Sequence, residues 1–191
     1  MRSDASYRSW ACAYSKHPMI DQDPSWSVCP GCGVRLRAIG TPPDVKRNSS
    51  AECWQLAGEV TGFELQHTAR LGRYHQLTVD AYGAQHADND GSGIRVAYSL
   101  VGLYLALERG MNGLEVRGIH QIMGKPQGDW PKFPRPSTPG EMTVLDVAAV
   151  GVRAQSVEGH EEAVQRWARS VWKAWLDRHR DVEELSNRWT S

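Results

Sequence analysis

Two cysteines separated by two residues begin the part of the chain whose residue types could do chemistry. Cys29 and Cys32 belong to the segment CPGCG at positions 29–33. Proline and glycine between them favour a tight turn that points both sulfur atoms to one side, where backbone N–H groups can bond to them. This spacing is typical of a tetrahedral zinc site. The alternatives are a turn with two free thiols and a redox pair, although no βαβ pattern surrounds the motif.

A closed zinc site needs two more ligands, and Cys53 is the natural third. It lies in the opening turn of a helix predicted over residues 50–71, which Ser49 or Ser50 can cap. A second helix is predicted over residues 74–87. The turn near residue 72 is short, so we expect the two helices to be antiparallel.

The fourth ligand follows from the height of each histidine in this hairpin. Residues i and about 144 − i lie level, so His86 stands about 7.5 Å from Cys53 along the axis, whereas His75 stands about 24 Å away. We therefore expect His86 to complete the site. Cys12 and a water molecule are the alternatives, and water would make the site potentially catalytic.

The same hairpin could bring acid–base groups close to the metal. Glu59 and Tyr82 lie near His86 in height, with Asp80 further along the second helix. A carboxylate, a phenol and an imidazole could together orient a metal-bound water. In the alternative interpretation Glu59 only accepts a hydrogen bond from His86, and Tyr82 belongs to the core. Asp80 lies in an apolar run, and if buried it needs a partner, for which Arg70, Arg95 and a backbone cap are the candidates.

Composition excludes several classes of protein. The chain has 191 residues, with 22 lysines and arginines balancing 22 aspartates and glutamates. A zero net charge argues against nucleic-acid binding driven by phosphate contacts. No stretch reaches about 18 consecutive apolar residues, and the N-terminus lacks the apolar block of a secretion signal. We expect a cytoplasmic protein without a membrane span, in which cysteines are reduced, metal-bound or buried.

Periodicity and loop signals predict a mainly α fold, a bundle of four or five principal helices with an N-terminal zinc knuckle. Residues 1–28 are expected to be an irregular arm, and residues 29–191 the domain. Beyond the first hairpin, helices are predicted over 94–109, 111–124, 144–150 and 159–185, with a strand as the alternative at 144–150. The proline-rich segment 125–140 is predicted to be a loop whose Trp130 and Phe133 form either a cover over the core or a lid.

Several segments resemble a bacterial family of unknown function in which a cysteine knuckle precedes a helical domain with a VDAY segment. They are CPGCG (29–33), SAECW (50–54), HQLTVDAYGAQH (75–86), LVGLYLALERG (100–110), PGEMTVLDV (139–147) and WARSVWKAW (167–175). The resemblance covers about residues 29–185 and leaves Cys12 outside. It implies this order of elements and a zinc site, and it implies no particular reaction.

Two functions follow from these patterns. One is a zinc-dependent enzyme that acts on a small molecule in a cavity of the bundle, with Glu59, Tyr82 and Asp80 as catalytic groups. The other is a non-enzymatic module in which zinc is structural and a surface binds a protein or ligand. Three protein ligands plus water favour the enzyme, and four protein ligands favour the module.

Overall fold

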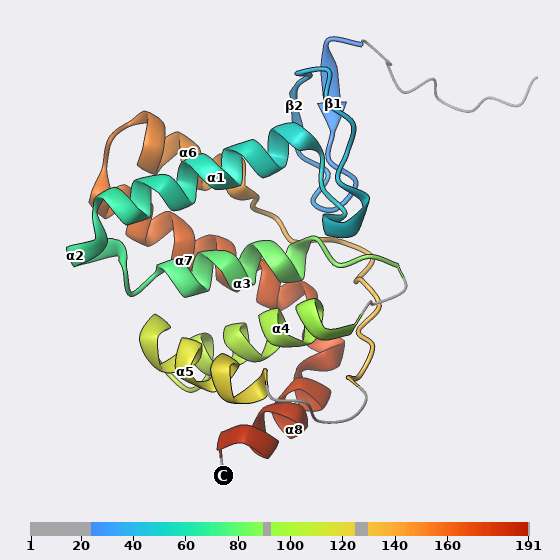
Figure 1. Cartoon of the computed structure of the whole chain (residues 1–191), viewed down its shortest axis with the longest axis vertical. Coiled ribbons are helices and arrows are strands. Elements are labelled where there is room, and N and C mark those ends of the chain that lie inside the picture. Colours follow the sequence, from blue (N-terminus) through green and yellow to red (C-terminus); the bar gives the residue numbers. More distant parts are fainter. Residues whose placement is uncertain (1–23, 90–92, 125–129, 191) are drawn as a thin grey trace, which may run out of the picture.

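The protein is mainly helical, which confirms the mainly α part of the predicted fold class. The computed structural model describes residues 24–89, 93–124 and 130–190 (Figure 1). Its helices are α1 (Ala51–Gln66), α2 (Thr68–Leu71), α3 (His75–Gln85), α4 (Gly93–Leu107), α5 (Gly113–Met123), α6 (Val144–Ala148), α7 (Val157–Ala174) and α8 (His179–Thr190). Short 3-10 turns span Val45–Arg47 and Leu176–Arg178, and a π-helical turn spans Ala149–Arg153. In the described part of the chain, no helix is both long and apolar enough to cross a membrane.

A small antiparallel hairpin precedes the helices, at the opposite end of the molecule from α8 (Figure 1). Strands β1 (Trp26–Val28) and β2 (Arg35–Arg37) pair in the register Trp26 to Arg37. The expectation that residues 1–28 are irregular is therefore wrong for 26–28. A strand of three residues is too short to show the alternation that sequence patterns detect. Residues 1–23 of that arm, which include Cys12, lie outside the described part of the chain.

The first helical hairpin follows the predicted order, with a break that the sequence pattern did not reveal. Ser50 caps α1 by accepting a hydrogen bond from the backbone N–H of Cys53 at 3.2 Å. The predicted helix 50–71 is interrupted at His67, where the backbone leaves helical geometry before α2. The chain then reverses, and α3 runs back so that its end approaches the start of α1 (Figure 1).

Helix α4 lies inside the bundle and packs closely on α3. Val96, Leu100 and Leu103 are completely buried, as expected for a helix that is apolar on nearly all sides. Close approach depends on Gly102, because a Cβ there would stand 2.5 Å from Cγ of Asp80. The two helices can therefore lie against each other only while this position has no side chain.

The last predicted helix, residues 159–185, is in fact two helices. Helix α7 ends at Ala174, and a 3-10 turn redirects the chain so that α8 packs against α4. His179 stacks on Trp172 with ring centroids 3.8 Å apart, and its Nε2 lies 3.0 Å from the Trp172 carbonyl oxygen. The same carbonyl oxygen also accepts a hydrogen bond from the Trp175 N–H at 3.0 Å, so His179 adds a second contact at the end of α7. Within 144–150 the structure has α6, so the predicted helix is correct there and the strand alternative is wrong.

The segment after residue 129 runs as a loop up the side of the molecule to the hairpin end (Figure 1). Phe133 is 2% exposed, and Trp130 packs between the rings of Tyr98 and Trp189 at 5.1 and 6.0 Å. These aromatic side chains cover the core, as in the simpler of the two interpretations. Residues 125–129 of the predicted loop lie outside the described part.

Candidate functional site

Three cysteines and one histidine converge where the hairpin meets the helices. His86 Nε2 lies 3.4 Å from Sγ of both Cys29 and Cys53, and the sulfur atoms of Cys32 and Cys53 are 3.7 Å apart. All four donor atoms lie within 4.8 Å of one another. The residues are 1%, 5%, 0% and 0% exposed in the order Cys29, Cys32, Cys53 and His86. The cluster is thus compatible with a buried metal site.

The donor spacing matches what a tetrahedral zinc ion requires. With Zn–S distances of about 2.3 Å and Zn–N distances of about 2.0–2.1 Å, tetrahedral angles place two sulfurs about 3.8 Å apart and a sulfur and a nitrogen about 3.6 Å apart. The distances of 3.7 and 3.4 Å lie close to these values. Thiolate and imidazole donors are also those that zinc prefers, so the residues present fit the ion.

A backbone contact fixes which nitrogen His86 offers. Nδ1 lies 2.8 Å from the carbonyl oxygen of Tyr82, to which it can only donate, so the proton belongs on Nδ1. Nε2 then carries the free lone pair that faces the thiols. The ring of Tyr82 stacks on that of His86 with centroids 3.9 Å apart, which restricts rotation of the imidazole. The metal-facing tautomer is therefore set by residues outside the donor set.

Two hydroxyl groups lie against the sulfur atoms. Oη of Tyr82 is 3.6 Å from Sγ of Cys53 and 2.6 Å from Oγ of Ser49. Burial raises the pKa of Tyr82, which keeps the phenol protonated and able to donate. Among the thiols, hydrogen bonds from Cys32 and Cys53 lower the pKa of Cys29, and the bond to Cys29 raises that of Cys32. The Tyr82 hydroxyl, which donates to Cys53, is the kind of donor that stabilises a thiolate.

The turn between Cys29 and Cys32 is held from three directions. Its backbone is closed by a bond from the Cys29 N–H to the Val34 carbonyl at 2.9 Å. Arg135, from the loop before α6, donates to the carbonyl oxygens of Pro30 and Gly31 at 2.9 and 3.3 Å. At Gly31 a Cβ would stand 2.5 Å from Cδ2 of His86, so only glycine lets the knuckle approach the histidine.

A model of one protein family matches residues 27–176, a span that begins in β1, contains all four donors and ends just beyond α7. This chain belongs to the DUF5946 family, a family of unknown function. Comparisons with curated proteins and with solved structures found no match.

In this DUF5946 chain the predicted acid–base groups do not gather around the cluster. Tyr82 lies beside His86, but Glu59 lies on the exposed face of α1, where it accepts a hydrogen bond from Gln55 at 3.2 Å. Asp80 is buried at the α3–α4 interface, and its Oδ1 accepts from Gln76 at 3.1 Å. The expectation of an arginine partner is wrong, since Arg95 donates to backbone carbonyl oxygens and Arg70 pairs with Glu158 and Glu161.

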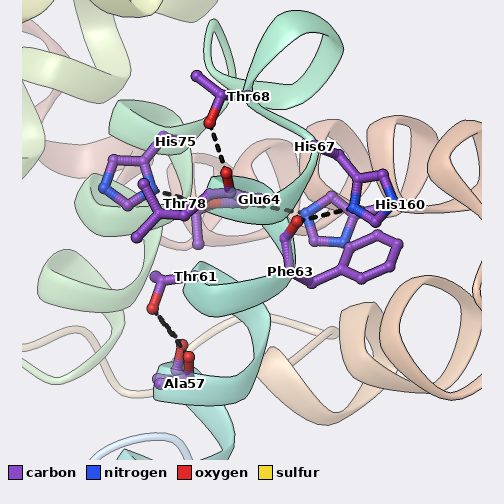
Figure 2. Close-up of polar contacts among 11 residues, drawn as sticks. Ala57, Thr61, Phe63, Glu64, His67, Thr68, His75, Thr78 and His160 are labelled. Carbon is purple, nitrogen blue, oxygen red and sulfur yellow. Dashed lines mark hydrogen bonds and ion pairs between the residues drawn. The ribbon is translucent and has the colours of Figure 1, made fainter.

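A second polar cluster in this DUF5946 chain surrounds Glu64 of α1, which is completely buried as a side chain (Figure 2). Its oxygens bond to Nε2 of His160 at 2.9 Å and to Nδ1 of His75 at 2.8 Å, and they accept from Thr78. Burial raises the pKa of Glu64, but the bonds from His160, His75 and Thr78 outweigh it, and the pKa is lowered overall. The cluster thus links α1, α3 and α7.

Sequence reasoning missed this cluster and the role of Arg135. His160 is 96 residues from Glu64, and no spacing rule connects α7 with α1 at that separation. Arg135 lies in an irregular loop, where periodicity says nothing about direction. Glu64 itself gave a weak signal, because a carboxylate beside the apolar face of a helix needs a buried partner.

Proposed function

We propose that this DUF5946 protein is a non-enzymatic zinc module, in which Cys29, Cys32, Cys53 and His86 bind one structural zinc ion. The observation that carries the proposal is the mutual spacing of four buried protein donors, within 4.8 Å of one another. Structural zinc sites use four protein ligands, whereas catalytic sites leave one position to water. Four donors at tetrahedral spacing fill the coordination sphere.

The role of the ion would be to hold the hairpin and knuckle on the helical body. The donors come from three separate parts of the chain: the knuckle, the first turn of α1 and the end of α3. The described β-sheet has only two strands, and such a hairpin is marginally stable by itself. Metal binding at this junction would supply free energy that the short strands lack.

The location of Glu59 supports the module over the enzyme. A metal-dependent reaction of the kind expected from the sequence needs a general base near the ion. Glu59 points to solvent beside Gln55, and Tyr82 is stacked on His86 with its hydroxyl bonded to Ser49. These contacts leave neither Glu59 nor Tyr82 as a general base beside the ion, and they favour a role for Tyr82 in holding the ligands in position over a reaction at the metal.

Metal analysis and cobalt substitution test the proposal. Purified protein should contain about one zinc per chain, and Cys29→Ser or Cys32→Ser should lose both the ion and much of the thermal stability. Cobalt in the site should give a tetrahedral spectrum with sulfur-to-metal charge transfer that added azide leaves unchanged. A spectrum that shifts with azide would indicate an open position and favour the enzyme. Metal-free wild-type protein, or full stability in both serine variants, would contradict any zinc site.

A further inference from the structure

A surface hollow of about 460 Å³ lies between α3, α4 and α5, away from the cysteine cluster. Its volume is within the range of small-molecule sites, about 300–1,000 Å³. The side chains that form it include Gln76, Val79, Asp80, Ile94, Tyr98 and His120. None of these residues takes part in the proposed zinc site.

The rim of the hollow is apolar and open to water. Val79 is 43% exposed and Ile94 is 51% exposed, although both are large hydrophobic residues. Tyr98 lies beside them, with its ring packed against those of His120 and Trp130. Covering such a rim with an apolar ligand is favourable in proportion to the area removed from water.

Two polar groups at the hollow, the Asp80 carboxyl and Nε2 of His120, have an atom without a described hydrogen-bond partner, and the carboxyl is the one that can be charged to match a cation. Asp80 is 2% exposed, and its Oδ2 is buried without a hydrogen-bond partner among the described residues. Its only described donor is the neutral Gln76 amide, 3.1 Å from Oδ1. Burial raises the pKa of the Asp80 carboxyl well above its usual range. Burying a carboxylate costs free energy unless a cation or several neutral groups donate hydrogen bonds to it. This group therefore favours a ligand that donates to it.

We infer that the hollow binds a small primary amine, whose ammonium group bonds to Asp80 and whose apolar body covers Val79 and Ile94. Gln76 also lines the hollow, and an ammonium group that replaces its amide beside Oδ1 would give the buried carboxylate the cationic donor that it lacks among the described residues. An anionic ligand fits less well. The one arginine at the hollow, Arg95, already donates to the carbonyl oxygens of Gly83 and His86 at 3.2 and 3.0 Å.

Three probes of matched shape test the charge of the ligand: 2-phenylethylamine, 2-phenylethanol and phenylacetate. Each is titrated into isotopically labelled, metal-loaded full-length protein, and binding is followed by NMR shifts of the backbone amides. We expect saturable binding of the amine in the millimolar range that suits so small a molecule, with shifts centred on Val79 and Ile94. Phenylethanol should bind more weakly by about tenfold or more, the loss expected when a charge-assisted hydrogen bond is absent.

Two variants and one control assign the contacts. Asp80→Asn keeps the shape of the side chain and should weaken the amine by about tenfold while leaving phenylethanol unchanged. Val79→Arg places a long cation at the exposed rim and should abolish binding of both probes, whereas Leu176→Arg, also at an exposed site but outside the hollow, should not. Equal binding of amine and alcohol, stronger binding of phenylacetate, unchanged amine affinity in Asp80→Asn, or no saturable shifts would each overturn the inference.

Discussion

His86 donates from Nδ1 to the carbonyl oxygen of Tyr82 one helical turn earlier, at 2.8 Å, while its Nε2 faces the cysteines. Tyr82 therefore acts on the histidine twice, through its backbone and through the ring stacked on the imidazole. Its hydroxyl adds a third contact, to Ser49 and Cys53.

Removing only the hydroxyl of Tyr82 should loosen the site without emptying it. In Tyr82→Phe the ring stack and the backbone carbonyl remain, but the bonds to Ser49 and Cys53 are lost. We expect about one zinc per chain, a loss of about 1 kcal/mol in unfolding free energy, and faster zinc release to a chelator. Tyr74→Phe, which removes a half-buried hydroxyl that accepts from Gln165 at 3.4 Å, away from the cysteines, is the control. Equal release rates for Tyr82→Phe and wild type would disprove a role for the hydroxyl.

A single methyl group at position 31 should disturb the metal site. Gly31→Ala puts a Cβ 2.5 Å from Cδ2 of His86, so the imidazole or the knuckle must move. We expect weaker zinc binding in a competition assay with a chromogenic chelator. Gly58→Ala is the matched control, because no atom lies within 4 Å of its added Cβ on the exposed side of α1. That variant should bind zinc normally and gain up to about 1 kcal/mol in stability from helix propensity. Normal affinity in Gly31→Ala would contradict the close packing.

The Glu64 cluster should contribute strongly to stability. Glu64→Gln preserves the shape but removes the charge that strengthens the bonds to His160, His75 and Thr78. We expect a loss of about 2 kcal/mol in unfolding free energy, measured by urea denaturation. Glu59→Gln alters an exposed carboxylate on the same helix, so it should change stability by less than about 0.5 kcal/mol. Similar losses in the two variants would show that the bonds to Glu64 contribute little to stability.

The same cluster predicts a pH dependence of stability. The bond to Glu64 raises the pKa of His75 in the folded protein above its unfolded value of about 6.5. Protonated His75 thus stabilises the fold; the effect is complete below that pH and is lost as pH rises through the folded pKa. Denaturation from acidic to mildly alkaline pH should show wild type losing more stability than His75→Gln. The thiols titrate in both proteins, so their contribution cancels when the unfolding free energy of the variant is subtracted from that of wild type. Parallel curves would rule out the linkage.

Much of the candidate site could be predicted because helical rise is regular. The hairpin estimate placed His86 near Cys53, and the structure has Nε2 at 3.4 Å from Sγ. The same estimate failed for Glu59 because it gives height but not direction around the axis. Glu59 is six residues after Cys53, a rotation of about 240° at 100° per residue. It therefore faces away from the side of α1 on which Cys53 lies.

What could not be predicted depends on contacts between distant segments. Nothing in the sequence around Trp175 resembles a helix breaker, and the break there lets α8 pack on α4. The pairing of His160 with Glu64 likewise exists only once α7 lies against α1 and α3. Local patterns predict elements, whereas these features come from how the elements pack.

The sequence separation of the four donors has a consequence for how the protein is made. Cys29 and His86 are 57 residues apart, and Cys53 lies between them. During synthesis Cys29 and Cys32 leave the ribosome first, and the complete donor set exists only after α3 has emerged and folded back along α1. Zinc held earlier would have only two or three sulfur ligands, and a competing thiol could remove it more easily. For the proposed zinc site, supply of the metal and folding of the first helical hairpin would therefore have to coincide in time.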